Sequence, residues 1–134
     1  MAKAVHQRIE TCKDWLAYML SRPKLAFDST LNLLLPKEGG IYHIGEKDAE
    51  LCSLYVGEAD NLRDCILRGH LMGNRRTIIM KKKLIGSKKF RSEKRAEQYL
   101  RERCFVQYVL IEDKRFRRLL KYFLIGVLNP KFND

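Results

Sequence analysis

Two short β-type runs joined by a polar loop constrain the fold of this chain most. Residues 40–44 read GIYHI and residues 51–56 read LCSLYV, and both are rich in the β-branched and aromatic residues that favour strands. The six residues between them are polar, which suits a hairpin loop. Because neighbouring side chains in a strand point to opposite faces, a hairpin here also decides which residues share a face. A third run of the same kind, residues 104–111, predicts a three-stranded sheet.

Helical periodicity surrounds these runs. Apolar residues recur at three- and four-residue steps in four segments, which we predict as helices: 4–20, 60–71, 92–103 and 114–128. A further short helix is expected at 77–84, whereas residues 24–35 are apolar without a clear period and leave a second early helix open. The predicted fold class is therefore α/β (α+β), a small, mostly antiparallel three-stranded sheet flanked by helices. We expect a single compact domain: an N-terminal helical extension (1–36) and a core domain (37–134) with a basic helical insertion at about 72–103.

Charge narrows the class of partner. The 134 residues carry a formal net charge of +11, and 14 basic against four acidic residues lie between positions 61 and 103. So lopsided a surface predicts binding to a polyanion. The residues expected to contact nucleic-acid phosphates are Arg63, Arg68, Arg75, Arg76, Lys81, Lys82, Lys83, Lys88, Lys89 and Arg91. The alternatives are that the basic residues only form a solvated surface, or that they bind an acidic protein.

Other classes are disfavoured. No apolar run approaches the roughly 20 residues of a membrane span, and the first residues lack the apolar stretch of a signal peptide. Cys12, Cys52, Cys65 and Cys104 are scattered without the spacing of a zinc site or of a disulfide framework. We therefore expect reduced thiols, no membrane association, and a cytoplasmic, nucleoid or nuclear protein that is not secreted.

The paired strands carry a motif. Residues 40–42 read GIY, and twelve residues later residues 55–57 read YVG, followed by a predicted helix that opens at residues 61–62. Residues 124–133 then combine a helix end with a proline and a closing asparagine. This combination, over roughly residues 39–134, resembles the GIY-YIG nuclease superfamily, whose members hydrolyse phosphodiester bonds with one divalent metal such as Mg²⁺. The N-terminal helix and the basic stretch look like additions that restriction-type members carry.

The resemblance implies roles for individual residues. In the family a tyrosine activates the water, an arginine stabilises the phosphate, a glutamate holds the metal and an asparagine supports the site. Tyr42 and Tyr55 match the tyrosines of the two motifs, and Asn133 matches the asparagine. His70 resembles a histidine that family members often carry near this point, where it would accept a proton or contact phosphate. Its other interpretation is a cation at the end of a helix.

Two positions depart from the family. Eight residues after Gly57, where the family has its arginine, stands Cys65; twelve residues before Asn133, where it has its glutamate, stands Lys121. A thiol that is mostly neutral cannot clamp phosphate, and an ammonium repels a metal ion. Arg68 and Glu58 offer at most partial compensation. We therefore expect no metal bound in this sequence and an inactive or severely impaired enzyme.

Two functions remain open at this level. One is a GIY-YIG-type DNA endonuclease disabled by the loss of the arginine and the glutamate; the other is a non-catalytic nucleic-acid-binding module on a degenerate GIY-YIG fold. DNA is the expected partner, with RNA as the alternative. A homodimer is one way for such a domain to cut both strands. Lys121 itself is either a solvated lysine or a counter-ion to a bound phosphate.

Overall fold

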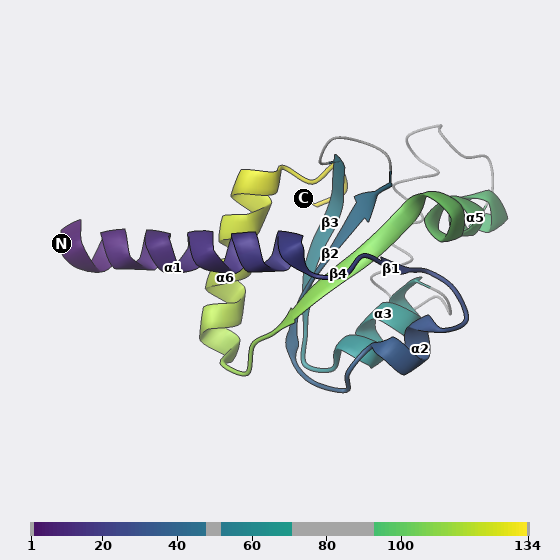
Figure 1. Ribbon diagram of the computed structural model, residues 1–134, viewed down its shortest axis with the longest axis horizontal. Helices are drawn as coiled ribbons and strands as arrows, with labels where there is room; N and C mark the ends of the chain where they lie inside the picture. Colours follow the sequence, from purple (N-terminus) through teal and green to yellow (C-terminus); the bar gives the residue numbers. More distant parts are fainter. Residues whose placement is uncertain (1, 48–51, 71–92, 134) are drawn as a thin grey trace.

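The fold is a four-stranded sheet with helices on both faces (Figure 1). The computed structural model describes residues 2–47, 52–70 and 93–133. The strands are β1 (Leu25–Ala26), β2 (Gly40–Glu46), β3 (Cys52–Ala59) and β4 (Cys104–Leu110), in the order β1-β4-β2-β3 with every neighbouring pair antiparallel. The helices of the described residues are α1 (Ala2–Ser21), α2 (Leu31–Leu34), α3 (Leu62–His70), α5 (Glu93–Arg103) and α6 (Lys114–Leu128).

The mixed α/β architecture with an antiparallel sheet is confirmed, but the expected number of strands was wrong. The fourth strand, β1, consists of two residues, with Leu25 opposite Val106 and Ala26 opposite Phe105. Two residues are too few to display a period of two, so the pattern of residues 24–35 could not reveal them. Residues 24–35, where a second early helix was left open, thus contribute a strand to the sheet and a single helical turn, α2.

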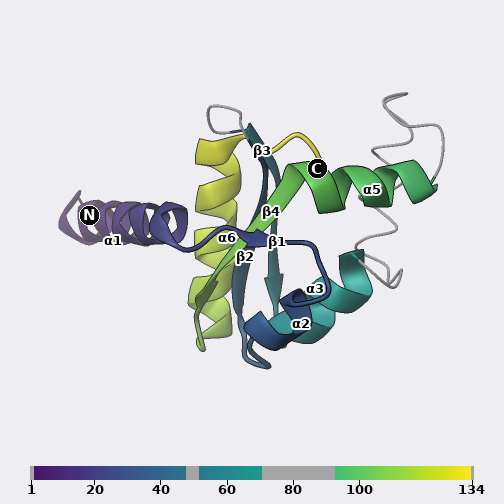
Figure 2. The ribbon, with the colours of Figure 1, turned by 45° about the vertical axis from the view of Figure 1, so that its right-hand side comes forward.

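Two apolar clusters lie on opposite faces of the sheet. On the first face, which we call the tyrosine face, Tyr42, Ile44 and Val106 pack with residues of α2, α3 and α5. On the second, the α6 face, Ile41, Val56 and Val109 pack with α1 and α6. The two ribbon views agree on this layering (Figures 1 and 2). Alternating residues of β2 therefore belong to different layers, as the period of a strand requires.

The first half of α1 extends beyond the body of the fold (Figure 1). Its apolar stripe continues there, yet Val5 and Ile9 are exposed, whereas Cys12 and Met19 further along the stripe are buried. Periodicity predicted the helix correctly but could not say which turns would find a partner. No helix within the described ranges is long and apolar enough to cross a membrane.

α6 is capped at its amino end, and the chain after its carboxyl end returns to β3. Asp113 caps the first turn by accepting hydrogen bonds from the backbone nitrogens of Arg115 and Phe116. The helix ends at Asn129, whose left-handed backbone (φ 48°) turns the chain back toward β3. The backbone nitrogen of Lys131 then donates to Ser53 O at 3.1 Å. The tail therefore follows the outer edge of the sheet.

Candidate functional site

The two motif tyrosines lie together on the tyrosine face. The ring centroids of Tyr42 and Tyr55 are 5.9 Å apart with an interplanar angle of 33°. Register explains the meeting: Ile44 stands opposite Tyr55, and the register shift next to Ile44 leaves Leu54 as an extra residue. Leu54 and Tyr55 consequently both pack into the cluster on the tyrosine face. Tyr42 is fully buried, whereas Tyr55 is only half-buried.

The glycine of the second motif has a steric role. Gly57 is the cross-strand partner of Tyr42. A Cβ atom at Gly57 would stand 2.5 Å from both Cζ and Oη of Tyr42 and 2.7 Å from its Cε1. The phenol of Tyr42 therefore lies flat over the backbone of Gly57, and a larger residue would displace it.

Cys65 lies against the hydroxyl of Tyr42. Its thiol donates to Tyr42 Oη across 3.8 Å, and the thiol is only half-buried. The first turn of α3 is held in place because the backbone nitrogens of Leu62 and Arg63 donate to Glu38 O and Pro36 O, at 2.9 and 3.0 Å. The position at which the resemblance expects an arginine thus adjoins the first motif tyrosine. At this position a thiol, in place of a guanidinium, faces the Tyr42 hydroxyl.

Asn133 completes the outer edge of β3. Its side-chain amide exchanges two hydrogen bonds with the backbone of Val56, each 2.8 Å long, one accepted from the nitrogen and one donated to the carbonyl oxygen. The backbone nitrogen of Phe132 also donates to Leu54 O at 2.9 Å. The amide of Asn133 takes the place of a peptide group of an adjacent strand. Its partner, Val56, directly follows Tyr55 in the chain. Asn133 therefore supports the strand that carries this tyrosine.

Lys121 lies in the other layer. It belongs to α6, which packs on the opposite face of the sheet from Tyr42 and Tyr55. Because α6 starts beside Asp60 and its tail returns to Ser53, Lys121 in the middle of the helix is level with the middle of β3. Its ammonium is 5.8 Å from the centroid of the Tyr122 ring. Since β3 is an edge strand, Lys121 and Tyr55 stand on either side of the same edge.

The predicted DNA-binding residues fall into three groups. Arg63 is half-buried, and its Nε donates to Leu35 O at 2.7 Å, so this guanidinium takes part in the fold. Arg68 and His70 lie on α3, where only the backbone is described. The remaining ones lie outside the described residues: Arg75, Arg76, Lys81, Lys82, Lys83, Lys88, Lys89 and Arg91.

The donor set does not fit the divalent cation that the fold implies. Across residues 2–47, 52–70 and 93–133, no three His, Cys, Asp or Glu side chains gather as metal ligands would. Where the resemblance expects a glutamate, Lys121 offers an ammonium, which has no lone pair for a metal.

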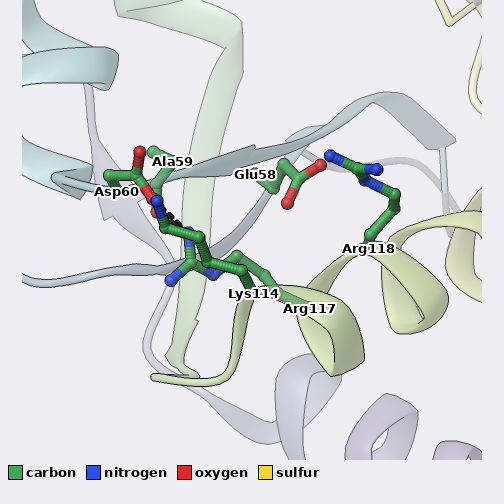
Figure 3. Close-up of a pocket in the computed structure, with 6 residues that line it drawn as sticks. All are labelled: Glu58, Ala59, Asp60, Lys114, Arg117 and Arg118. Carbon is green, nitrogen blue, oxygen red and sulfur yellow. Dashed lines mark hydrogen bonds and ion pairs between the residues drawn. The ribbon is translucent and has the colours of Figure 1, made fainter.

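Two groups of buried polar side chains, centred on Arg117 and on His43, also belong to this architecture. Arg117 is 4% exposed, and its guanidinium donates to the carbonyl oxygens of Ile111 and Ala59 and to Asp60 Oδ1, at 3.1, 2.9 and 3.0 Å. It thereby joins α6 to the ends of β3 and β4 (Figure 3). In the sequence it is one of five cations in α6, and no local signal distinguishes it from the exposed ones.

His43 is the centre of the second polar group. Its Nδ1 is 3.1 Å from Gln107 Oε1, and its Nε2 is 2.9 Å from Ser53 Oγ. The amide nitrogen of Gln107 donates to two carbonyl oxygens at the end of α1, which leaves only its oxygen to face the imidazole. Nδ1 must then carry the proton, and Ser53 donates to Nε2. Burial lowers the pKa of His43 below its usual value.

Comparison with known proteins bears on the fold. No family model matches the chain, and no curated protein matches it significantly. Solved structures of the GIY-YIG N-terminal endonuclease domain of UvrC from Thermotoga maritima do match. The domain bound to magnesium, its catalytic divalent cation, is 23% identical, with 77% of this chain and 91% of that chain covered at a TM-score of 0.50.

Two point mutants of the same domain, each also bound to the catalytic cation, match equally well. A tyrosine-to-phenylalanine mutant is 19% identical over 78% of this chain and 92% of that one, with a TM-score of 0.52. An asparagine-to-alanine mutant is 19% identical over 77% and 90%, with a TM-score of 0.51. At such identities the likeness concerns the path of the backbone. The chain has the fold of a GIY-YIG endonuclease domain.

Proposed function

We propose that this protein is a DNA-binding domain of the GIY-YIG nuclease type whose hydrolytic activity is absent or severely impaired because Cys65 and Lys121 replace an arginine and a glutamate. The observation that carries the proposal is the convergence of Tyr42, Tyr55 and Cys65 on one face, with the thiol 3.8 Å from the Tyr42 hydroxyl. The likeness to UvrC endonuclease domains supports a nuclease-type function and DNA as the partner.

The chemistry explains the impairment. Hydrolysis of a phosphodiester requires a cation against the charge that develops on the phosphorane and a Lewis acid near the leaving oxygen. Cys65 supplies no charge, and Lys121 supplies charge without a ligand atom. The absence of each function costs on the order of 10³-fold in rate. The two tyrosines alone cannot compensate for both.

Restoring both residues tests the proposal. Cys65→Arg combined with Lys121→Glu should allow the protein to nick supercoiled plasmid DNA in Mg²⁺, whereas the unaltered protein and each single substitution stay inactive or nearly so. In the doubly substituted background, Tyr42→Phe and Tyr55→Phe should each abolish nicking. Circular dichroism and a thermal melt verify that each variant is folded, which matters most for an arginine placed beside the buried Tyr42.

The outcomes separate clearly. Mg²⁺-dependent nicking that requires the tyrosines supports the proposal. A folded double variant that remains silent, with unaltered DNA binding, refutes the catalytic half and leaves a binding domain. Nicking by the unaltered protein refutes the claim that the two substitutions disable it.

A second function, non-catalytic binding of DNA or RNA, is favoured by one observation. Tyr42 is 0% exposed, so its hydroxyl cannot touch a phosphate without a rearrangement of its surroundings. This function predicts salt-sensitive binding that Mg²⁺ does not alter. It also predicts that Tyr42→Phe leaves affinity unchanged, which a binding titration with duplex DNA and with RNA would measure.

A further inference from the structure

The surface of α6 has a charge distribution that its own stability does not explain. The helix carries five cations and no acid: Lys114, Arg115, Arg117, Arg118 and Lys121. Among the other described helices, α1, α3 and α5 each mix both signs, and α2 carries no charge. Four of the five cations of α6 lie within its first five residues, and only Arg117 is buried.

These cations oppose the local electrostatics. The amino end of a helix is the positive end of its dipole, where each exposed cation costs about 0.3–1 kcal/mol. Lys114 and Arg118 are four residues apart, and Lys121 follows three later, so like charges are neighbours along one stripe of the helix. The Asp113 carboxylate, which caps the first turn, offsets part of this cost. An external anion would remove the penalty.

The acids nearby offset only part of this charge. Asp60 Oδ1 is 3.0 Å from Arg117 Nη1 and 3.5 Å from Lys114 Nζ. The hydrogen bond from Arg117 and, second, the charge of Lys114 lower the pKa of Asp60. Glu58 points toward Arg118 across a cavity of about 240 Å³ (Figure 3). Lys114 remains 77% exposed in spite of its pairing. With Glu112 and Asp113, which directly precede the helix, four carboxylates thus lie near the five cations of α6, and a positive excess of one remains.

The stripe also has a direction. It starts beside Asp60 at one end of β3 and reaches Lys121, which is level with the middle of that strand. Successive cations on a helix stripe lie about 5–6 Å apart, so the three side chains form a continuous line of positive charge. The line therefore runs along the outer edge of the sheet, where Asn133 is bonded to Val56 beside Tyr55.

We propose that the stripe Lys114–Arg118–Lys121 is a contact surface for the phosphate backbone of a nucleic-acid duplex, in addition to the predicted basic insertion. This inference deepens the proposed function and depends on it. The position that the resemblance assigns to a metal-binding glutamate then serves as one of three phosphate contacts. The contacts give affinity without reading sequence, since phosphates carry no base information.

A salt titration of binding tests the surface directly. Affinity of a duplex of about 20 base pairs is measured by fluorescence anisotropy at several salt concentrations for the unaltered protein and for Lys114→Gln with Arg118→Gln. Each lost phosphate contact lowers the slope of log affinity against log salt by about 0.9, so the double variant should lose about 2. At about 0.1 M salt this corresponds to roughly 60-fold weaker binding.

A matched control separates a local surface from overall charge. Lys3→Gln with Arg8→Gln removes the same charge from exposed positions of α1, and this variant should keep the slope within about 0.5 of the original. The charge-conserving Lys114→Arg with Arg118→Lys should also keep it. A thermal melt of the α6 variant verifies that it is folded, so that weaker binding does not reflect unfolding.

Each result has a distinct meaning. A slope reduced only in the α6 variant supports the surface. Equal losses in the α6 and α1 variants, or no loss in either, overturn it while DNA binding itself stands. If an acidic polypeptide such as polyglutamate competes as well as duplex does at equal charge, the assignment to nucleic acid is overturned. If the unaltered protein binds no duplex in low salt, the proposed function fails together with this inference.

Discussion

The packing of Tyr42 over Gly57 yields the sharpest test of the candidate site. In Gly57→Ala the new methyl group would lie 2.5 Å from Cζ and Oη of Tyr42, whereas ordinary contacts lie at 3.4–4 Å. The ring would have to shift by about 1 Å, yet it is fully buried, between Tyr55 and Cys65. Gly57 does not adopt a positive φ, so the penalty is steric alone. Overpacking of this kind costs about 1–3 kcal/mol.

We expect a loss of about 2 kcal/mol, which for a domain of this size lowers the melting temperature by about 6–10 °C. Gly126→Ala is the matched control, because a Cβ there meets nothing within 4 Å on the exposed side of α6. Alanine in a helix interior is better than glycine by about 0.5–1 kcal/mol, so this variant should melt higher. Calorimetry or a thermal melt measures both.

A double-mutant cycle decides whether the contact with Tyr42 causes the destabilisation in Gly57→Ala. With Tyr42→Leu the ring atoms are gone, and adding Gly57→Ala should then change stability by less than about 0.5 kcal/mol. The coupling between the two positions would be about 2 kcal/mol. A Gly57→Ala protein that melts like the unaltered one, or an equal loss in the Tyr42→Leu background, would refute the packing argument.

Three further outcomes follow from polar side chains that join elements of the fold. Arg117→Lys keeps the charge but loses the planar fork that satisfies the carbonyl oxygens of Ala59 and Ile111, so we expect a loss of about 3 kcal/mol in denaturant melts. An unchanged denaturation midpoint would contradict this role of Arg117. Because burial lowers the pKa of His43, the unfolded chain binds more protons below its usual value of about 6.5. The contribution of neutral His43 to folding stability is then complete above about pH 6.5 and is lost as pH falls toward the lowered pKa. His43→Gln should flatten this part of the curve of unfolding free energy against pH. An unaltered curve would show that another group titrates. Asn133→Ala removes both hydrogen bonds to Val56 and should cost about 1–2 kcal/mol; Asn133→Asp should not restore it, since a carboxylate cannot donate to the Val56 carbonyl, and hydrogen exchange at the Val56 amide reports the loss directly.

Much of the local structure could be predicted from the chain itself. Strand-type residues at 40–44 and 51–56 with a polar loop between them placed a hairpin, and three- and four-residue steps placed α1, α3, α5 and α6 within a few residues of their observed ends. The GIY and YVG motifs marked Tyr42 and Tyr55 as candidate site residues, and the structure places their ring centroids 5.9 Å apart. These features depend on periods and turns that neighbouring residues express by themselves.

Tertiary structure alone decided the rest. The two residues of β1 become a strand only because β4 offers a partner, and the extra residue at Leu54 appears only when β2 and β3 are paired. Arg117 looks like its exposed neighbours in α6 until the carbonyl oxygens at the ends of two strands surround it. Local periodicity states which face of an element is apolar, but not what will cover it. The free energy of pairing and burial between segments far apart in the chain makes that choice.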